Sequence, residues 1–177
     1  MVAWVPKVFT TEQVTSLLGL DVKKDKWRVV KFAESEEYGI RPSISAPSGS
    51  GSRRLYDLEN VCEIALALRL LETGLRSKAI GRVIRKLRQQ GKLSAKLNAA
   101  NNDADKFLAI IRTPEPGKPL DKQRDMLVEW VGGADQAEAI WKKEPNRDLI
   151  LVPLRPMFLE LDQRLQQLKS KQVGKIS

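Results

Sequence analysis

The stretch that most constrains this chain is residues 48–57, which read Ser-Gly-Ser-Gly-Ser-Arg-Arg-Leu-Tyr-Asp. Alternating glycine and serine favour a protruding, flexible loop tip. Arg53 and Arg54 follow, and each is a permanent cation whose planar guanidinium suits a phosphate. Leu55 and Tyr56 return to apolar character, and Asp57 is a good N-cap for a helix. The run therefore predicts a loop that ends in paired cations beside a helix, an arrangement suited to gripping a nucleic-acid backbone.

Two helices are predicted before this loop. Residues 9–20 form the first, with Thr10 as its cap, Gln13 at capping-box spacing and Gly19 as its stop. Residues 21–37 form the second, with a basic first half and an apolar face that includes Trp27 and Val30. This order is typical of a helix-turn-helix, whose second helix meets base edges with its N-terminal residues. The alternative is that the basic half is an ordinary solvated face.

A small hairpin is expected around the glycine-serine tip. Residues 43–46 would pair with residues 53–56 across the tip, because both segments have extended character and the tip supplies the turn. A helix-turn-helix followed by such a hairpin is a winged helix. The alternative for Arg53 and Arg54 is a surface loop with solvated charges.

Two further helices are predicted after the loop. Residues 57–73 carry an apolar stripe with Gly74 just past its end, and Cys62 is expected to pack there as a small hydrophobic side chain. Ser77 is expected to cap the next helix, which combines an apolar face with uncompensated cations. These cations are expected to face the DNA backbone and a partner subunit. They are Arg76, Lys78, Arg82, Arg85, Lys86, Arg88 and Lys92.

The second half is predicted to be a small α/β unit, which makes the whole chain α+β. Residues 93–105 resemble a linker, residues 106–112, 125–131 and 149–154 are strands, and residues 134–143 are a helix. A final helix has apolar residues at alternating spacings of three and four, which predicts a dimer interface. Docking of that helix on its own domain is the alternative. The stripe is Phe158, Leu161, Leu165 and Leu168.

Composition narrows the function. The chain of 177 residues has 31 Lys/Arg against 22 Asp/Glu, and residues 1–92 hold 17 against 10, so the excess lies mainly in the half with the loop. Nucleic acid is the leading partner for this asymmetry, with an anionic membrane surface second. Cys62 is the only cysteine and histidine is absent, which excludes an intrachain disulfide, Ser-His-Asp or Cys-His catalysis, and a thiolate or imidazole metal site. We therefore expect no enzyme, no metal and no cofactor.

The sequence shows neither a membrane-spanning segment nor a secretory signal. No apolar stretch approaches the roughly 20 residues of a spanning helix, and the N-terminus lacks the pattern of a secretory signal. These observations predict a cytoplasmic, nucleoid-associated protein.

The order of these pieces resembles the MerR-type winged-helix family of bacterial transcription regulators. The resemblance covers about residues 7–90 and is most specific at Arg54-Leu55-Tyr56 and at the helix pair broken at Gly74-Leu75. The second helix departs from the family pattern, with Trp-Arg-Val-Val-Lys-Phe at residues 27–32, and the family's metal-sensing cysteines are absent.

The resemblance implies a DNA-binding domain at residues 1–92, a linker at 93–105 and an effector or dimerisation domain at 106–177. It also implies a homodimer that binds an inverted repeat. The bound dimer would distort the promoter DNA so that RNA polymerase can, or cannot, engage the promoter. The resemblance does not specify an effector. The expected DNA contacts are Thr11, Lys23, Lys24, Lys26, Arg28, Lys31, Arg41, Arg53, Arg54 and Tyr56. The alternative function is an architectural or phage-type nucleic-acid adaptor without a transcriptional role.

Overall fold

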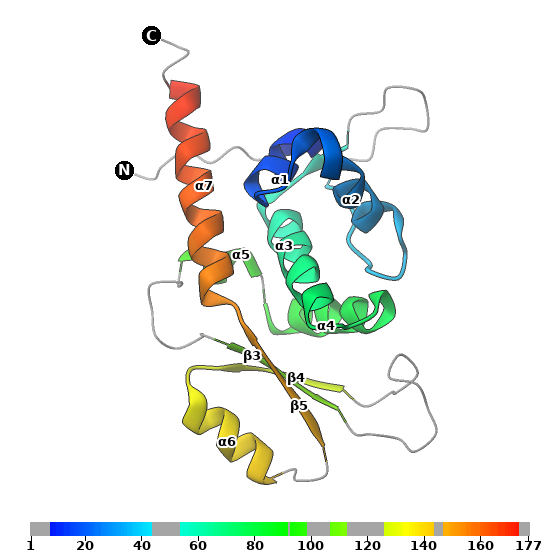
Figure 1. The fold of residues 1–177 in the computed structure, drawn as a ribbon, viewed down its shortest axis with the longest axis vertical. Coiled ribbons are helices and arrows are strands. Elements are labelled where there is room, and N and C mark those ends of the chain that lie inside the picture. The colour runs from blue at the N-terminus through cyan, green and yellow to red at the C-terminus, as the bar shows by residue number, and fades with distance from the viewer. Residues whose placement is uncertain are drawn as a thin grey trace.

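The computed structural model describes residues 8–43, 54–91, 93–98, 107–112, 126–143 and 147–173. Four helices and a two-stranded sheet form an N-terminal unit that we call the head, and a three-stranded sheet lies beyond α4 (Figure 1). The long helix α7 runs along one side of the head. The elements of the head are β1 (Phe9–Thr10), α1 (Thr11–Leu17), α2 (Val22–Glu34), β2 (Leu55–Tyr56), α3 (Leu58–Glu72) and α4 (Ser77–Gln90).

Local side-chain caps explain where the first three helices begin. The Thr10 hydroxyl accepts from the Gln13 backbone N–H at 3.3 Å, and the Gln13 side chain accepts from the Thr10 N–H at 2.8 Å, which confirms the predicted capping box. Asp21 and Asp57 cap α2 and α3. The prediction for Ser77 was wrong, because it is the first residue of α4 and its hydroxyl donates to Glu37 instead of capping the helix.

The small sheet of the head contains a strand pairing that was not predicted. Leu55 and Tyr56 pair antiparallel with Thr10 and Phe9, the residues just before α1. Phe9 and Tyr56 are both fully buried, so this pairing places two aromatic side chains in the core. The partner expected at residues 44–46, the glycine-serine tip and Arg53 lie outside the described residues.

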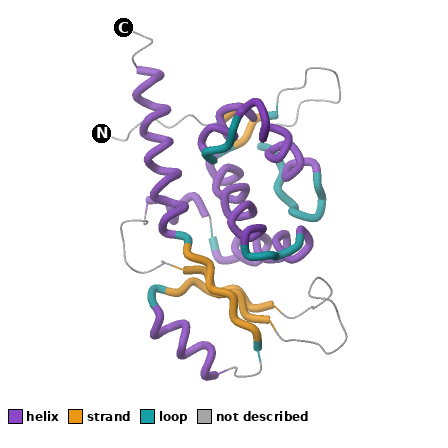
Figure 2. The backbone as a smooth tube through the Cα atoms, viewed as in Figure 1, coloured by secondary structure: helices purple, strands orange, loops and turns teal. Residues whose placement is uncertain are grey.

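The second sheet confirms the α+β prediction for the C-terminal half. It consists of β3 (Phe107–Arg112), β4 (Met126–Val131) and β5 (Asp148–Pro153), in the order β4-β3-β5 with β3 antiparallel to both neighbours. β4 and β5 are therefore parallel to each other, with α6 (Ala134–Lys143) between them in sequence, which is a split β-α-β arrangement. α6 lies on the face of the sheet that points away from the head, as Figures 1 and 2 show.

One continuous core joins the two halves. Leu108, Val128 and Val152 of the sheet belong to the same buried cluster as the apolar side chains of α3 and α4. Part of the expected linker is in fact the helix α5 (Leu93–Asn98), whose Leu93 is buried. The Glu59 carboxylate of α3 accepts from the first N–H groups of α5, at 2.7 and 2.9 Å, so an acidic side chain satisfies a helix N-terminus.

The C-terminal helix α7 (Arg155–Val173) packs on its own chain. Phe158, Leu161 and Leu165 are almost fully buried, and Leu168 packs partly buried against the same cluster. The stripe predicted as a dimer interface is therefore already covered, and that assignment was wrong. The physical reason is that α1 and α5 lie against α7 and supply the apolar surface that two heptads need.

Candidate nucleic-acid interface

The orientation of α2 decides which of its side chains can meet a ligand. Val29 and Phe32 are buried, whereas Trp27 is 60% exposed. Successive residues of a helix are about 100° apart, so Trp27 lies about 200° from Val29, on the opposite side. The prediction that Trp27 belongs to the apolar inner face was wrong. The helical angle reveals the face of Trp27 only after the structure has shown that Val29 and Phe32 are buried.

Three lysines surround Trp27 on the solvent side. Lys23, Lys24 and Lys31 are three or four residues from Trp27, so their side chains share its face, and all three are exposed. Within the described ranges, none of the three has a carboxylate partner at ion-pair distance. We call Lys23, Lys24, Trp27 and Lys31 the outer face of α2.

The other two predicted cations of α2 have different positions. Lys26 pairs with Glu12 of α1, and this hydrogen bond is the main reason why the pKa of Glu12 lies below its ordinary value. Arg28 lies 3.7 Å from Asp25 on its own helix, and its side chain lines a cavity between α2, α3 and α7. Lys26 therefore holds α1 and α2 together, and Arg28 stands at the flank of the outer face.

The residues expected to bind phosphates around β2 are less available than predicted. Arg54 pairs with Glu34 at the C-terminal end of α2. Tyr56 is fully buried, so its assignment as a phosphate contact was wrong. Burial raises the pKa of Tyr56, and the nearby Thr11 hydroxyl opposes that rise. Thr11 is itself buried, and its carbonyl accepts from the Thr15 hydroxyl at 2.7 Å, so Thr11 belongs to the packing of α1 and its assignment as a DNA contact was wrong.

The basic residues of α4 are partly compensated. The Glu63 carboxylate of α3, only 1% exposed, accepts two hydrogen bonds from Arg88, and Lys78 lies 4.0 Å from Glu37. The interpretation of α4 as a row of uncompensated cations was therefore wrong for these two residues. Arg41 is exposed and lines a polar groove with residues of α3 and α4, apart from the outer face of α2.

The described residues contain no group of three His, Cys, Asp or Glu side chains that could hold a metal ion. No helix in the same part of the chain is both long and apolar enough to cross a membrane. Comparison with protein-family models and with curated proteins finds no match for this chain.

Proposed function

We propose that the protein is a sequence-specific, double-stranded DNA-binding regulator of MerR type and that α2 enters the major groove. The observation that carries the proposal is the outer face of α2, where an exposed tryptophan stands among three exposed lysines. α1 and α2 pack together as a two-helix unit, and in such units the second helix is the one that fits the groove. The surplus of positive charge in residues 1–92 favours an anionic partner such as nucleic acid.

The two kinds of side chain on the outer face have different roles. Lysine is a compact point charge on a flexible stem, so Lys23, Lys24 and Lys31 would neutralise backbone phosphates and set affinity and register. Trp27 offers an apolar surface of the kind that contacts the thymine methyl group in the major groove. Trp27 would therefore contribute to sequence preference and the lysines to binding of any sequence.

The regulator would bind an inverted repeat as a homodimer. The apolar stripe of α7 is occupied within one chain, so the contact between two copies would use another surface. Selection from random duplexes separates this function from the architectural alternative. A regulator enriches an inverted repeat, whereas an adaptor enriches little beyond flexible or A/T-rich sequence.

The salt dependence of binding tests the outer face directly. Replacing Lys23, Lys24 and Lys31 together by Gln should reduce the steepness of log K against log salt by about 2.7 per subunit, or about 5.4 for the dimer, because each phosphate contact contributes about 0.9. The matched control replaces three exposed lysines of α6 and α7, with the same change in net charge. They are Lys142, Lys143 and Lys171.

The control variant should keep the slope of the wild type. Equal slopes for the two triple variants would remove α2 from the proposed interface. Trp27→Ala should leave the slope unchanged and flatten the preference at one position of the selected site. A preference profile identical to that of the wild type would show that Trp27 does not contact the bases.

A further inference from the structure

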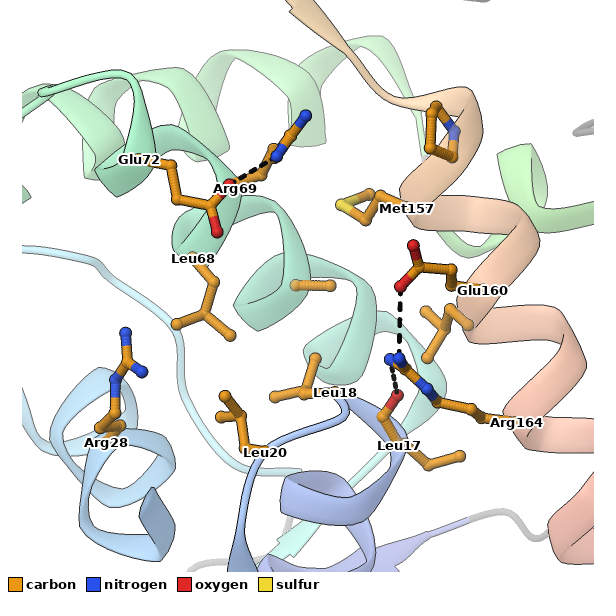
Figure 3. Close-up of a pocket in the computed structure, with 13 residues that line it drawn as sticks. Leu17, Leu18, Leu20, Arg28, Leu68, Arg69, Glu72, Met157, Glu160 and Arg164 are labelled. Atoms are coloured by element: carbon orange, nitrogen blue, oxygen red, sulfur yellow. Dashed lines mark hydrogen bonds and ion pairs between the residues drawn. The ribbon is translucent and has the colours of Figure 1, made fainter. Parts of the chain in front are cut away.

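A cavity of about 240 Å³ lies where the turn between α1 and α2 meets α2, α3 and α7 (Figure 3). One part of its lining is apolar and consists of Leu18 and Leu20 from the turn, Leu68 from α3 and Met157 from α7. The rest is charged. Arg28 extends from α2, whereas Glu72 and Arg69 come from α3, and Glu160 and Arg164 come from α7.

The charged side chains that line this cavity are three arginines and two glutamates. Arg69 pairs with Glu72 at 2.6 Å, and Arg164 pairs with Glu160 at 3.2 Å, so each carboxylate is engaged by an arginine of its own helix. The third guanidinium, that of Arg28, forms an ion pair with Asp25 outside the lining, but their separation of 3.7 Å is too long for a hydrogen bond. Arg28 therefore retains the capacity for a two-pronged pair with one further carboxylate.

We propose that this cavity binds a small apolar monocarboxylic acid, with its carboxylate on Arg28 and its apolar body on Leu20, Leu68 and Met157. Among the arginines of the lining, Arg28 is the one that makes no hydrogen bond to a carboxylate, so the site suits a ligand with a single carboxylate. The volume is consistent with this class, because an apolar cavity of about 150 Å³ accommodates benzene. The present cavity thus has room for one ring and a short acidic arm.

The position of the cavity connects such a ligand to α2. Arg164 of α7 donates to the Leu17 carbonyl at 3.2 Å, at the end of α1. Its guanidinium also covers Gly19, where an added Cβ would lie 2.6 Å from that group. A ligand in the cavity would touch α2, α3 and α7 at once, so a ligand that fits one position of α2 better than another would shift α2 relative to α7. This coupling rests on the proposed function, whereas binding of the acid does not.

Calorimetric titration of the full chain tests the site without DNA. The probe is 3-phenylpropionate, and its neutral amide is the matched ligand control. We expect the acid to bind with a submillimolar Kd and the amide at least tenfold more weakly. Arg28→Gln should weaken binding of the acid about tenfold, whereas Lys31→Gln, on the same helix but outside the cavity, should leave it unchanged.

Other outcomes overturn the proposal. Equal binding of acid and amide, no heat at 5 mM acid, or an unaltered Kd in Arg28→Gln would each exclude a carboxylate site at Arg28. Leu68→Trp provides a second variant, since a larger side chain should fill the cavity and abolish binding while the thermal transition shows that the chain is folded. If the acid binds but DNA affinity stays the same at saturation, the site stands and the coupling to α2 is wrong.

Discussion

The ion pair between Glu63 and Arg88 makes an asymmetric prediction about stability. Glu63 is 1% exposed, whereas the Arg88 side chain is 38% exposed. The Arg88 guanidinium donates to Glu63 at 2.7 Å and to the Gly39 carbonyl at 2.9 Å, so it joins α3, α4 and the loop after α2. The hydrogen bonding of Arg88 to Glu63 is also the main reason why the pKa of Arg88 is raised.

Arg88→Ala should destabilise the chain more than Glu63→Ala. Removing one partner of a buried pair costs about 3–5 kcal/mol, and the partial exposure of Arg88 places its removal near 3 kcal/mol. Glu63→Ala leaves a guanidinium that water can reach, so we expect a loss of about 1–2 kcal/mol. The double variant should lose less than the sum of the two single losses, because neither partner is then left buried alone.

Urea unfolding followed by tryptophan fluorescence measures these free energies. Arg85→Ala is the matched control, an exposed arginine one turn earlier on α4, and should change the free energy of unfolding by no more than about 0.5 kcal/mol. Equal losses in the two single variants, or additive losses in the double variant, would refute the reasoning that burial of Glu63 makes the pair asymmetric.

Three further predictions concern close packing, pH and thiol reactivity. Gly81→Ala should lower the free energy of unfolding by about 2 kcal/mol, because the added Cβ would lie 1.8 Å from the Glu37 carbonyl oxygen. This loss should outweigh the better helix propensity of alanine. A variant as stable in urea as the wild type, or more stable, would contradict this prediction. The pKa of Glu12 is lowered in the folded chain by Lys26, so this pair stabilises at neutral pH and the contribution is lost as the pH falls below 4.5. Glu12→Gln should therefore lower the free energy of unfolding by less than about 1 kcal/mol at pH 7 and leave it unchanged well below pH 4.5. A difference in stability between the variant and the wild type that widens in acid would exclude the ion pair as its source. Burial raises the pKa of Cys62 well above its ordinary value, so an aromatic disulfide reagent should react with it only after unfolding; rapid reaction of the native chain would contradict its placement.

Nearest-neighbour chemistry explains what could be predicted. The capping box of Thr10 and Gln13, the cap at Asp57 and the helix at 134–143 are each encoded within a few residues, and all were confirmed. The three strands of the second sheet were likewise recognisable as short apolar runs between turn signals. In the candidate site, Lys23, Lys24 and Lys31 could be selected because their charge and their spacing along one helix are local properties.

Long-range contacts explain what could not be predicted. Leu55 and Tyr56 have strand character, but only the folded chain pairs them with the segment before α1. The polar residues after α4 resemble a linker until Glu59, more than thirty residues earlier, is placed at their N–H groups. Trp27 was assigned to the wrong face because its helix has several apolar residues and the burial of Val29 and Phe32 depends on the rest of the head.

The sequence by itself determined where most helices and strands begin and that the charge is concentrated in the first half. It also excluded histidine-dependent catalysis and an intrachain disulfide within these 177 residues. The tertiary structure alone decided which stripes are covered and which charges are neutralised. The stripe of α7 could have faced a second copy, and it packs instead on its own chain. Arg88 could have faced DNA, and it is held by Glu63. The reason is that burial and ion pairing depend on residues distant in sequence, whereas capping and periodicity depend on neighbours.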